Sequence, residues 1–190
     1  MKGFNSYTNG LDLSALKEYC IHHGRLTKYS KGDYFIKTGE TSRIVGYVEV
    51  GYFKYTVHNL SEHKDYITGF AFENEFVGDY PNCLYRKTSE VTIVAATSCM
   101  LYQLSGEELL RMLDSDCMKE VKQAISDQLF YQVYCQYLDT YRISTRERYH
   151  NLLHRCPDIV QSISLKDIAS YLKVTPTTIS NIRREITFCR

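Results

Sequence analysis

Residues 175–186 carry the side chains whose chemistry is most specific. Ile179, Ile182 and Ile186 recur at helical spacing and would form one buried stripe. The other positions carry hydroxyl, amide and guanidinium groups, which can bond to base edges and phosphates in the DNA major groove. The residues that we expect to contact DNA are Thr175, Thr177, Thr178, Ser180, Asn181, Arg183 and Arg184.

A second short helix is expected just before this one. Ser164 can cap its start, and Thr175 followed by Pro176 is a typical start for the helix after the turn. The small Ala169 stands where the two helices would cross closely. Lys173 occupies the turn position where glycine is common, so it is expected to adopt a left-handed conformation. Any amphipathic helix pair shares part of this pattern, but the combination favours a helix-turn-helix.

The charge is unevenly distributed along the chain. The 190 residues carry a net charge of only +1. Residues 142–190 hold nine Lys and Arg against four Asp and Glu, whereas the remainder holds fourteen against eighteen. A basic C-terminal part on a mildly acidic body is the electrostatic pattern expected of a DNA-binding module attached to another domain.

Cysteine and histidine do not group in a way that predicts a metal site. The seven cysteines are widely spaced without a C-x-x-C pair, which is typical of reduced thiols used as small apolar residues. His58 and His63 have no third ligand nearby, and His150 and His154 lack the glutamate of a metalloprotease helix. We therefore predict no metal, no cofactor and no enzymatic activity.

The sequence contains no signal for a membrane or for secretion. It has no apolar run of membrane-spanning length, and its first residues lack the apolar core of a signal peptide. The expected location is the cytoplasm, with no membrane partner.

A short amphipathic helix is expected at 10–24. From there to residue 104, apolar and polar residues alternate with a period of two. Glycines recur at positions 32, 39, 46 and 51 in the first part of this region, where they indicate turns. Short strands with regular turns predict a compact antiparallel β-roll or jelly-roll barrel. The expected strands are 33–37, 44–50, 52–58, 64–72, 76–80, 90–96 and 99–104.

A long helix is expected over 117–141, where neither Gly nor Pro occurs. A helix of that length is roughly 37 Å long, more than a small barrel can cover. We expect Val121, Ile125 and Leu129 to lie in a seam with the same helix of a second copy. The alternative is that the apolar stripe packs only on the barrel of its own chain.

Together these elements predict an α+β protein with three parts. Residues 1–115 form the barrel, 116–141 the dimerisation helix, and 142–190 an all-α helix-turn-helix domain. Ser105 is expected to cap a helix at 106–113, and Ser144 or Thr145 one at 145–155, which Pro157 ends. The recognition helix is expected to end near residue 187, leaving no room for a full wing.

Barrel, long helix and helix-turn-helix in this order resemble the Crp/Fnr superfamily of bacterial transcription regulators, over essentially the whole chain. The resemblance rests on Gly32-Asp33, Gly39-Glu40, residues 46–51, residues 75–79, the stretch 146–157 and the helix-turn-helix. It implies a cyclic nucleotide-binding-like barrel and a homodimer that binds a two-fold symmetric DNA operator. It also implies RNA polymerase as a partner.

The effector pocket that this resemblance implies departs from the cyclic-nucleotide pattern. The family's cassette has a Gly-Glu pair followed by an arginine that binds the cyclic phosphate. Here the pair is Gly78-Asp79, the arginine position falls near Ser89 and Glu90, and Arg86 comes three residues too early. A carboxylate at that position would repel a phosphate. We therefore expect a regulator whose barrel has lost cyclic-AMP binding.

One alternative function uses the same barrel. A cupin-like protein that binds a small molecule or metal would need three or four convergent His or Glu ligands, and the only histidines in the strand region are His58 and His63. The sequence leaves open the identity of any small-molecule effector, the operator and regulated genes, and the choice between activation and repression.

Overall fold

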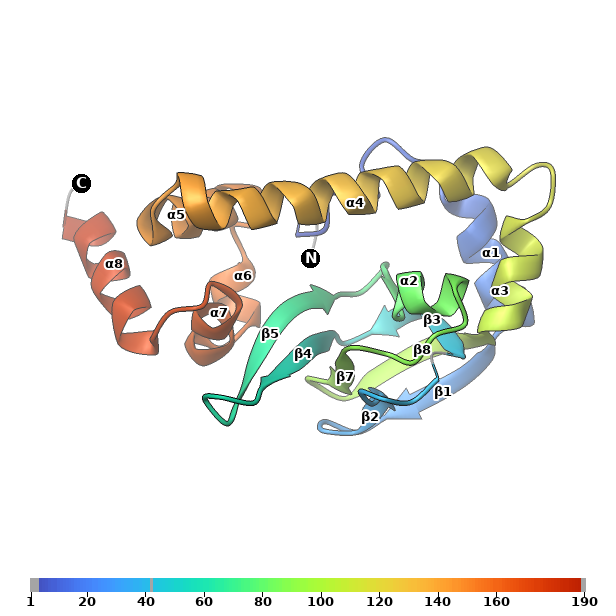
Figure 1. The fold of residues 1–190 in the computed structure, drawn as a ribbon, viewed down its shortest axis with the longest axis horizontal. Helices are drawn as coiled ribbons and strands as arrows, with labels where there is room; N and C mark the ends of the chain where they lie inside the picture. Colours follow the sequence, from blue (N-terminus) through green and yellow to red (C-terminus); the bar gives the residue numbers. More distant parts are fainter. Residues whose placement is uncertain (1–3, 42, 189–190) are drawn as a thin grey trace. The chain divides into compact units, whose positions relative to one another are not determined.

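The computed structural model describes residues 4–41 and 43–188, which form two compact units. One unit comprises residues 8–127, and the other combines residues up to Tyr7 with residues from Gln128 onward. The division therefore falls within the long helix, rather than at the boundaries near 115 and 141 expected from the sequence. Figure 1 labels the helices and most of the strands in chain order.

The barrel unit consists of two four-stranded antiparallel sheets, as the sequence predicts. One sheet has the order β1-β8-β3-β6 and the other the order β2-β7-β4-β5. The strands are β1 (Arg25–Tyr29), β2 (Tyr34–Ile36), β3 (Ile44–Val50), β4 (Phe53–Asn59), β5 (Lys64–Ala71), β6 (Phe76–Val77), β7 (Thr92–Ala95) and β8 (Cys99–Ser105). Phe35, Val48, Phe53 and Leu101 belong to a buried apolar cluster contributed by both sheets.

Two features of the barrel differ from the sequence-based expectation. Strand β1 was missed because it is an edge strand in which the apolar Leu26 is 49% exposed, so apolar and polar residues do not alternate clearly. The strand expected over 76–80 is wrong beyond Val77, since Tyr80–Leu84 forms the short helix α2. Pro81 explains this, because it suits the first turn of a helix and cannot donate to a strand ladder.

Gly46 does not form a corner between strands. It lies inside β3, where a Cβ atom would come within 2.4 Å of Leu101 Cδ1, so the glycine leaves room for the Leu101 side chain. Gly32, Gly39 and Gly51 do have positive φ, as turn glycines do.

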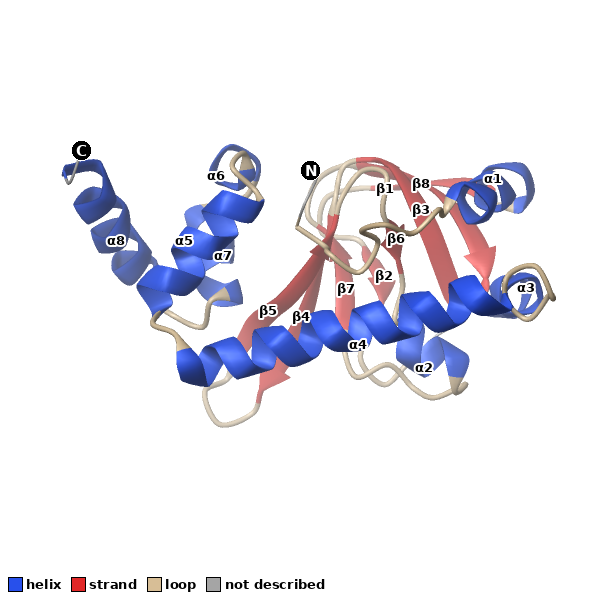
Figure 2. Cartoon of the chain, turned by 90° about the horizontal axis from the view of Figure 1, so that it is seen from above, coloured by secondary structure: helices blue, strands red, loops and turns tan. Residues whose placement is uncertain are grey.

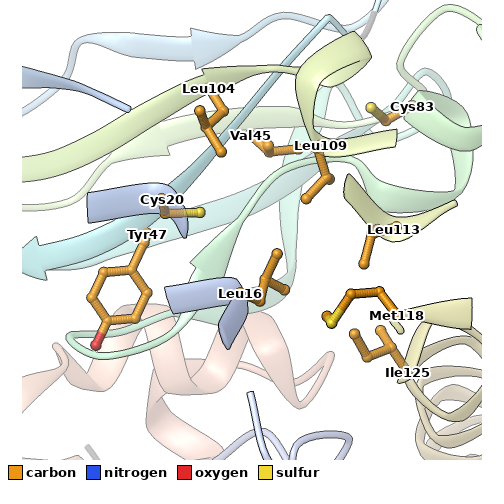
Figure 3. Close-up of a cluster of buried hydrophobic side chains, with 10 residues drawn as sticks. All are labelled: Leu16, Cys20, Val45, Tyr47, Cys83, Leu104, Leu109, Leu113, Met118 and Ile125. Carbon is orange, nitrogen blue, oxygen red and sulfur yellow. The ribbon is translucent and has the colours of Figure 1, made fainter. Parts of the chain in front are cut away.

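Three helices pack against the outside of the barrel. Helix α1 (Ser14–His23), helix α3 (Gly106–Leu113) and the first turns of α4 (Lys119–Arg142) contribute to a second apolar cluster. Leu16, Leu109, Met118 and Ile125 are members of this cluster, shown in Figure 3. Ser105 and Glu108 form a reciprocal capping box that begins α3 where the sequence predicts it.

The second unit contains the remaining helices. Ser144 and Glu147 form another capping box at the start of α5 (Thr145–Arg155), in agreement with the predicted helix at 145–155. A short helix α6 (Ile159–Ser162) follows, then α7 (Leu165–Tyr171) and α8 (Pro176–Phe188) (Figure 2). Tyr149, Leu152, Ile168 and Ile179 are fully buried between these helices.

Candidate nucleic-acid interface

The start of α8 is held by Thr175, which precedes the helix, and by Thr178 in its first turn. The backbone N–H of Thr178 donates to Thr175 Oγ1 over 3.1 Å, and the two hydroxyl oxygens are 2.8 Å apart. This is the N-cap expected for Thr175, with Pro176 at the first helical position. The hydroxyl groups of Thr175 and Thr178 therefore take part in positioning the helix.

The turn before α8 has the predicted geometry. Lys173 adopts φ 55°, and its N–H donates to the carbonyl of Ser170 over 3.0 Å. Val174 N–H donates to the carbonyl of Ala169 over 2.9 Å, which closes the end of α7. Ala169 is fully buried, in keeping with close approach of α7 and α8 at this residue.

Helix α8 separates an apolar face from a polar one. Ile179 and Ile182 are buried, as their spacing predicts, whereas Ile186 is half-buried. Thr177, Ser180, Asn181, Arg183 and Arg184 are exposed on the rest of the helix, as are Pro176 and Glu185. These residue types on one accessible face of a helix can bond to base edges and phosphate oxygens.

Two side-chain contacts shape the charge on this face. Arg184 Nη2 donates to Asn181 Oδ1 over 3.2 Å, which orients the amide. Glu185 is the only acidic residue of α8, and its Oε2 lies 3.3 Å from Nη1 of Arg146 in α5. That ion pair offsets the negative charge nearest to the two arginines.

The predicted effector residues separate into two groups. Asp79 and Ser89 are buried, at 8% and 2% exposure, and Ser89 Oγ donates to Asp79 Oδ2 over 2.6 Å. The same carboxylate oxygen accepts a hydrogen bond from Asn82 Nδ2 over 2.8 Å. Arg86 and Glu90, by contrast, are exposed, so neither is buried beside the Asp79 carboxylate.

Tyr55 is a residue of this region that sequence reasoning missed. Its hydroxyl accepts from Gly78 N–H over 3.1 Å and lies 3.3 Å from the Gly78 carbonyl, to which it can donate. Burial of the hydroxyl raises the pKa of Tyr55 above its ordinary value, so the phenol stays neutral. A tyrosine in a strand gives no sequence signal for this contact, since β4 and Gly78 meet only in the folded barrel.

The apolar stripe at the start of α4 packs against its own barrel unit. Ile125 is 7% exposed and packs in the cluster with Leu113 and Met118, as Figure 3 shows, and Val121 packs against the same cluster. Its own barrel unit thus covers Ile125, which supports the alternative that the apolar stripe packs on the barrel of its own chain. Leu129 is half-buried.

A different face of α4 carries exposed aromatic side chains. Phe130 and Tyr134 stack with ring centroids 6.0 Å apart, and Tyr137 and Tyr141 form an edge-to-face pair at 5.2 Å. All four are exposed. At 3.6 residues per turn, they lie roughly 120–180° around the helix from Ile125.

Metal and membrane features can be stated for the described residues. No three or more His, Cys, Asp or Glu side chains among them gather where they could hold a metal ion. In that same part of the chain, no helix combines the length and apolar character needed to span a membrane. The six cysteines within it form no disulfide with one another, and Cys189 lies outside it.

The barrel matches a known domain family. Residues 26–116 match the family model of the cyclic nucleotide-binding domain, over strands β1–β8 and helix α3. Residues 26–116 are therefore similar to that domain. Among curated proteins, no sequence relative matches this chain.

Solved structures extend the likeness to the whole chain. The c-di-GMP-responsive global regulator CLP from Xanthomonas campestris is 16% identical, with 93% of this chain and 92% of that chain covered and a TM-score of 0.68. FixK2 from Bradyrhizobium japonicum is 15% identical, with 87% and 85% covered and a TM-score of 0.74. The Thermus thermophilus catabolite activator protein is 13% identical, with 95% and 86% covered and a TM-score of 0.58.

These structures are Crp/Fnr-family transcription regulators, and at this identity the likeness concerns the fold. The chain has the Crp/Fnr regulator fold, with a cyclic nucleotide-binding domain at its N-terminal side. The fold that the sequence resemblance implies is thereby confirmed.

Proposed function

We propose that this protein is a homodimeric, sequence-specific DNA-binding transcription regulator of the Crp/Fnr type. The observation that carries the proposal is α8, whose polar and basic face is exposed over buried Ile179 and Ile182. A capped, packed helix with such a face is suited to the major groove. The expected location is the cytoplasm, and the Crp/Fnr resemblance implies RNA polymerase as a partner.

The dimer seam that we now favour is the aromatic face of α4. Phe130, Tyr134, Tyr137 and Tyr141 follow one another at intervals of four, three and four residues, which is the spacing of alternating core positions in a coiled coil. Large exposed aromatic residues in one row are unusual on a monomer surface. A second copy packing along this row would bury them.

For the barrel, we propose that cyclic-AMP binding has been lost. The Asp79 carboxylate is buried and already bonded to Ser89 and Asn82, and the Gly78 amide is bonded to Tyr55. A cyclic phosphate would meet a buried negative charge here without an arginine beside it, which is unfavourable. CLP is c-di-GMP-responsive, so the same fold can serve a different effector, whose identity here is open.

The proposal is tested by selecting DNA with the purified full-length protein from a library of random duplexes. We expect enrichment of a two-fold symmetric site whose half-sites are about one helical turn apart. A variant with Thr177, Ser180 and Asn181 replaced by alanine is the control, and it should retain duplexes without enriching that site. If the parent protein enriches no sequence over the starting library, the proposed function is wrong.

A further inference from the structure

The first described residues of the chain pack with the DNA-binding helices rather than with the barrel. Residues 4–7, which we call the strap, belong to the same compact unit as residues from Gln128 onward, whereas Thr8 already belongs to the barrel unit. Nothing in the Crp/Fnr resemblance or in the expected domain boundaries calls for this arrangement.

Gln132 of α4 holds one end of the strap. Its side-chain oxygen Oε1 accepts three hydrogen bonds, from Ser6 N–H at 2.6 Å, Ser6 Oγ at 2.9 Å and Tyr7 N–H at 3.0 Å. Its Nε2 donates to Asn5 Oδ1 over 3.4 Å. One amide side chain thus satisfies several polar groups of a segment without secondary structure, which is how a loop is fixed to a helix.

Phe4 holds the other end. Its side chain is 1% exposed, with the ring centroid 5.3 Å from that of Tyr171 in α7 and 5.4 Å from the guanidinium carbon of Arg155 in α5. Arg155 also hydrogen-bonds to Tyr171, and this contact works against the burial that raises the Tyr171 pKa. Phe4 therefore completes a buried aromatic and cationic cluster that joins α5 to α7.

The strap consequently bridges α4 and the helix-turn-helix. Apart from it, the covalent link between α4 and α5 is short, since α4 ends at Arg142 and α5 begins at Thr145. A short link allows rotation about a few backbone bonds, and a second attachment removes that freedom. Gln132 lies on the side of α4 near Ile125, opposite to the aromatic face, so the strap leaves the aromatic residues accessible.

We propose that the strap is a splint that fixes the helix-turn-helix relative to α4, with Phe4 and Gln132 as its positioning residues. The inference rests on the proposed function, because its consequence concerns a dimer on two half-sites. When both recognition helices are held at a fixed separation, binding of the second half-site is effectively intramolecular and depends on spacing. A released strap leaves each recognition helix intact but lets it move.

The test uses a matched pair of variants at one position. Gln132→Glu retains an acceptor for Ser6 and Tyr7, whereas Gln132→Leu keeps the size of the side chain and removes the acceptor. Phe4→Ala and Phe4→Leu form a second pair, in which leucine still fills most of the site. Leu60→Ala, at an exposed apolar residue of the barrel hairpin, controls for a general effect of substitution.

Two measurements are made on the full-length proteins. The first compares the affinity for the selected operator with that for an operator whose half-sites are moved apart by about two base pairs. The parent, Gln132→Glu, Phe4→Leu and Leu60→Ala should prefer the original spacing by about tenfold or more, and Gln132→Leu and Phe4→Ala by less than about threefold. The second is amide hydrogen exchange without DNA, where these two variants should exchange faster at Ile143 and Ser144.

The outcomes are distinguishable. The proposal that the strap restrains the helix-turn-helix is overturned by one combined result. In that result, Gln132→Leu and Phe4→Ala change neither the exchange at residues 143–144 nor the spacing preference. An equal loss of affinity for both operators also overturns it, since that result indicates a damaged recognition helix. If the parent protein binds no DNA, the proposed function fails, while the exchange measurement still decides whether the strap restrains the link.

Discussion

Arg184 donates a hydrogen bond from Nη2 to the side-chain oxygen of Asn181, which precedes it by three residues on the exposed face of α8. The contact orients the Asn181 amide, with its NH₂ group directed away from Arg184. The carbonyl oxygen keeps a second lone pair, so the side chain can still accept one bond and donate another. That combination matches N6 and N7 of adenine.

We predict an adenine at the half-site position that faces Asn181. Asn181→Arg should shift the preference at that base pair toward guanine, because arginine donates to O6 and N7 of guanine. The discrimination is expected to be about 1–3 kcal/mol. Selection from a library randomised at the operator measures it, and a base preference that ignores the residue at 181 would mean that Asn181 contacts only phosphate or water.

Replacing Arg183 and Arg184 by alanine should weaken DNA binding by about an order of magnitude or more. The slope of log affinity against log salt should fall by about one to two units, because fewer counterions are released from phosphates. The matched control is Lys28→Ala with Lys31→Ala, which removes two exposed positive charges from the barrel instead. If both double variants behave alike in a salt titration, the effect is one of net charge and α8 is not the interface.

The two faces of α4 should respond differently to substitution. Ile125→Ala is expected to lower the free energy of unfolding by about 2–5 kcal/mol, since it leaves a cavity in the core of its own barrel unit. Tyr137→Asp should leave that stability nearly unchanged but produce monomers, because it would place a charge within an apolar seam. Denaturant unfolding and sedimentation velocity distinguish them, and a Tyr137→Asp protein that sediments as a stable dimer contradicts the aromatic seam.

Cyclic AMP should not bind the barrel in the micromolar range. A calorimetric titration showing stoichiometric binding tighter than about 10 μM, roughly −7 kcal/mol, would contradict this expectation and implicate Arg86.

Ser89→Ala should lower the free energy of unfolding by about 1–3 kcal/mol, because it removes one hydrogen bond from the buried Asp79 carboxylate. Thermal unfolding of the variant beside the parent measures that cost.

The thiol of Cys20 should be chemically inert in the folded protein. Burial raises the pKa of Cys20 from 9.0 to about 12, because the thiolate would lose its hydration. The neutral thiol therefore contributes stability below about pH 9, and that contribution falls as the pH rises toward 12. At pH 8, alkylation followed by mass spectrometry should modify the exposed Cys117 well before Cys20; equal rates would show that the α1 packing opens readily.

Local signals in the sequence were sufficient for several elements. Ser105 and Ser144, each followed three residues later by glutamate, predict the starts of α3 and α5, and both capping boxes are present. The left-handed Lys173 and the cap at Thr175 were also predictable. These features depend on residues within a few positions of one another, so the chain itself carries the information.

Features that depend on distant residues were not predictable in this way. The apolar stripe of α4 is equally compatible with a second copy and with its own barrel, and only the packing of Ile125 beside Leu113 and Met118 distinguishes them. Strand β1 likewise acquires its conformation from pairing with β8, since its own residues alternate poorly.

The sequence by itself determined the order of barrel, long helix and helix-turn-helix, because periodicity, caps and turn residues act over short stretches. The tertiary structure alone decided which face of α4 is covered, that Tyr55 bonds to Gly78, and that Ser6 reaches Gln132 across 126 positions of the chain. Phe4 and Gln132 are ordinary residues until folding brings them to the helices that they join. The physical reason is that a side chain's burial and bonding partners depend on what the whole fold places around it, which no local pattern encodes.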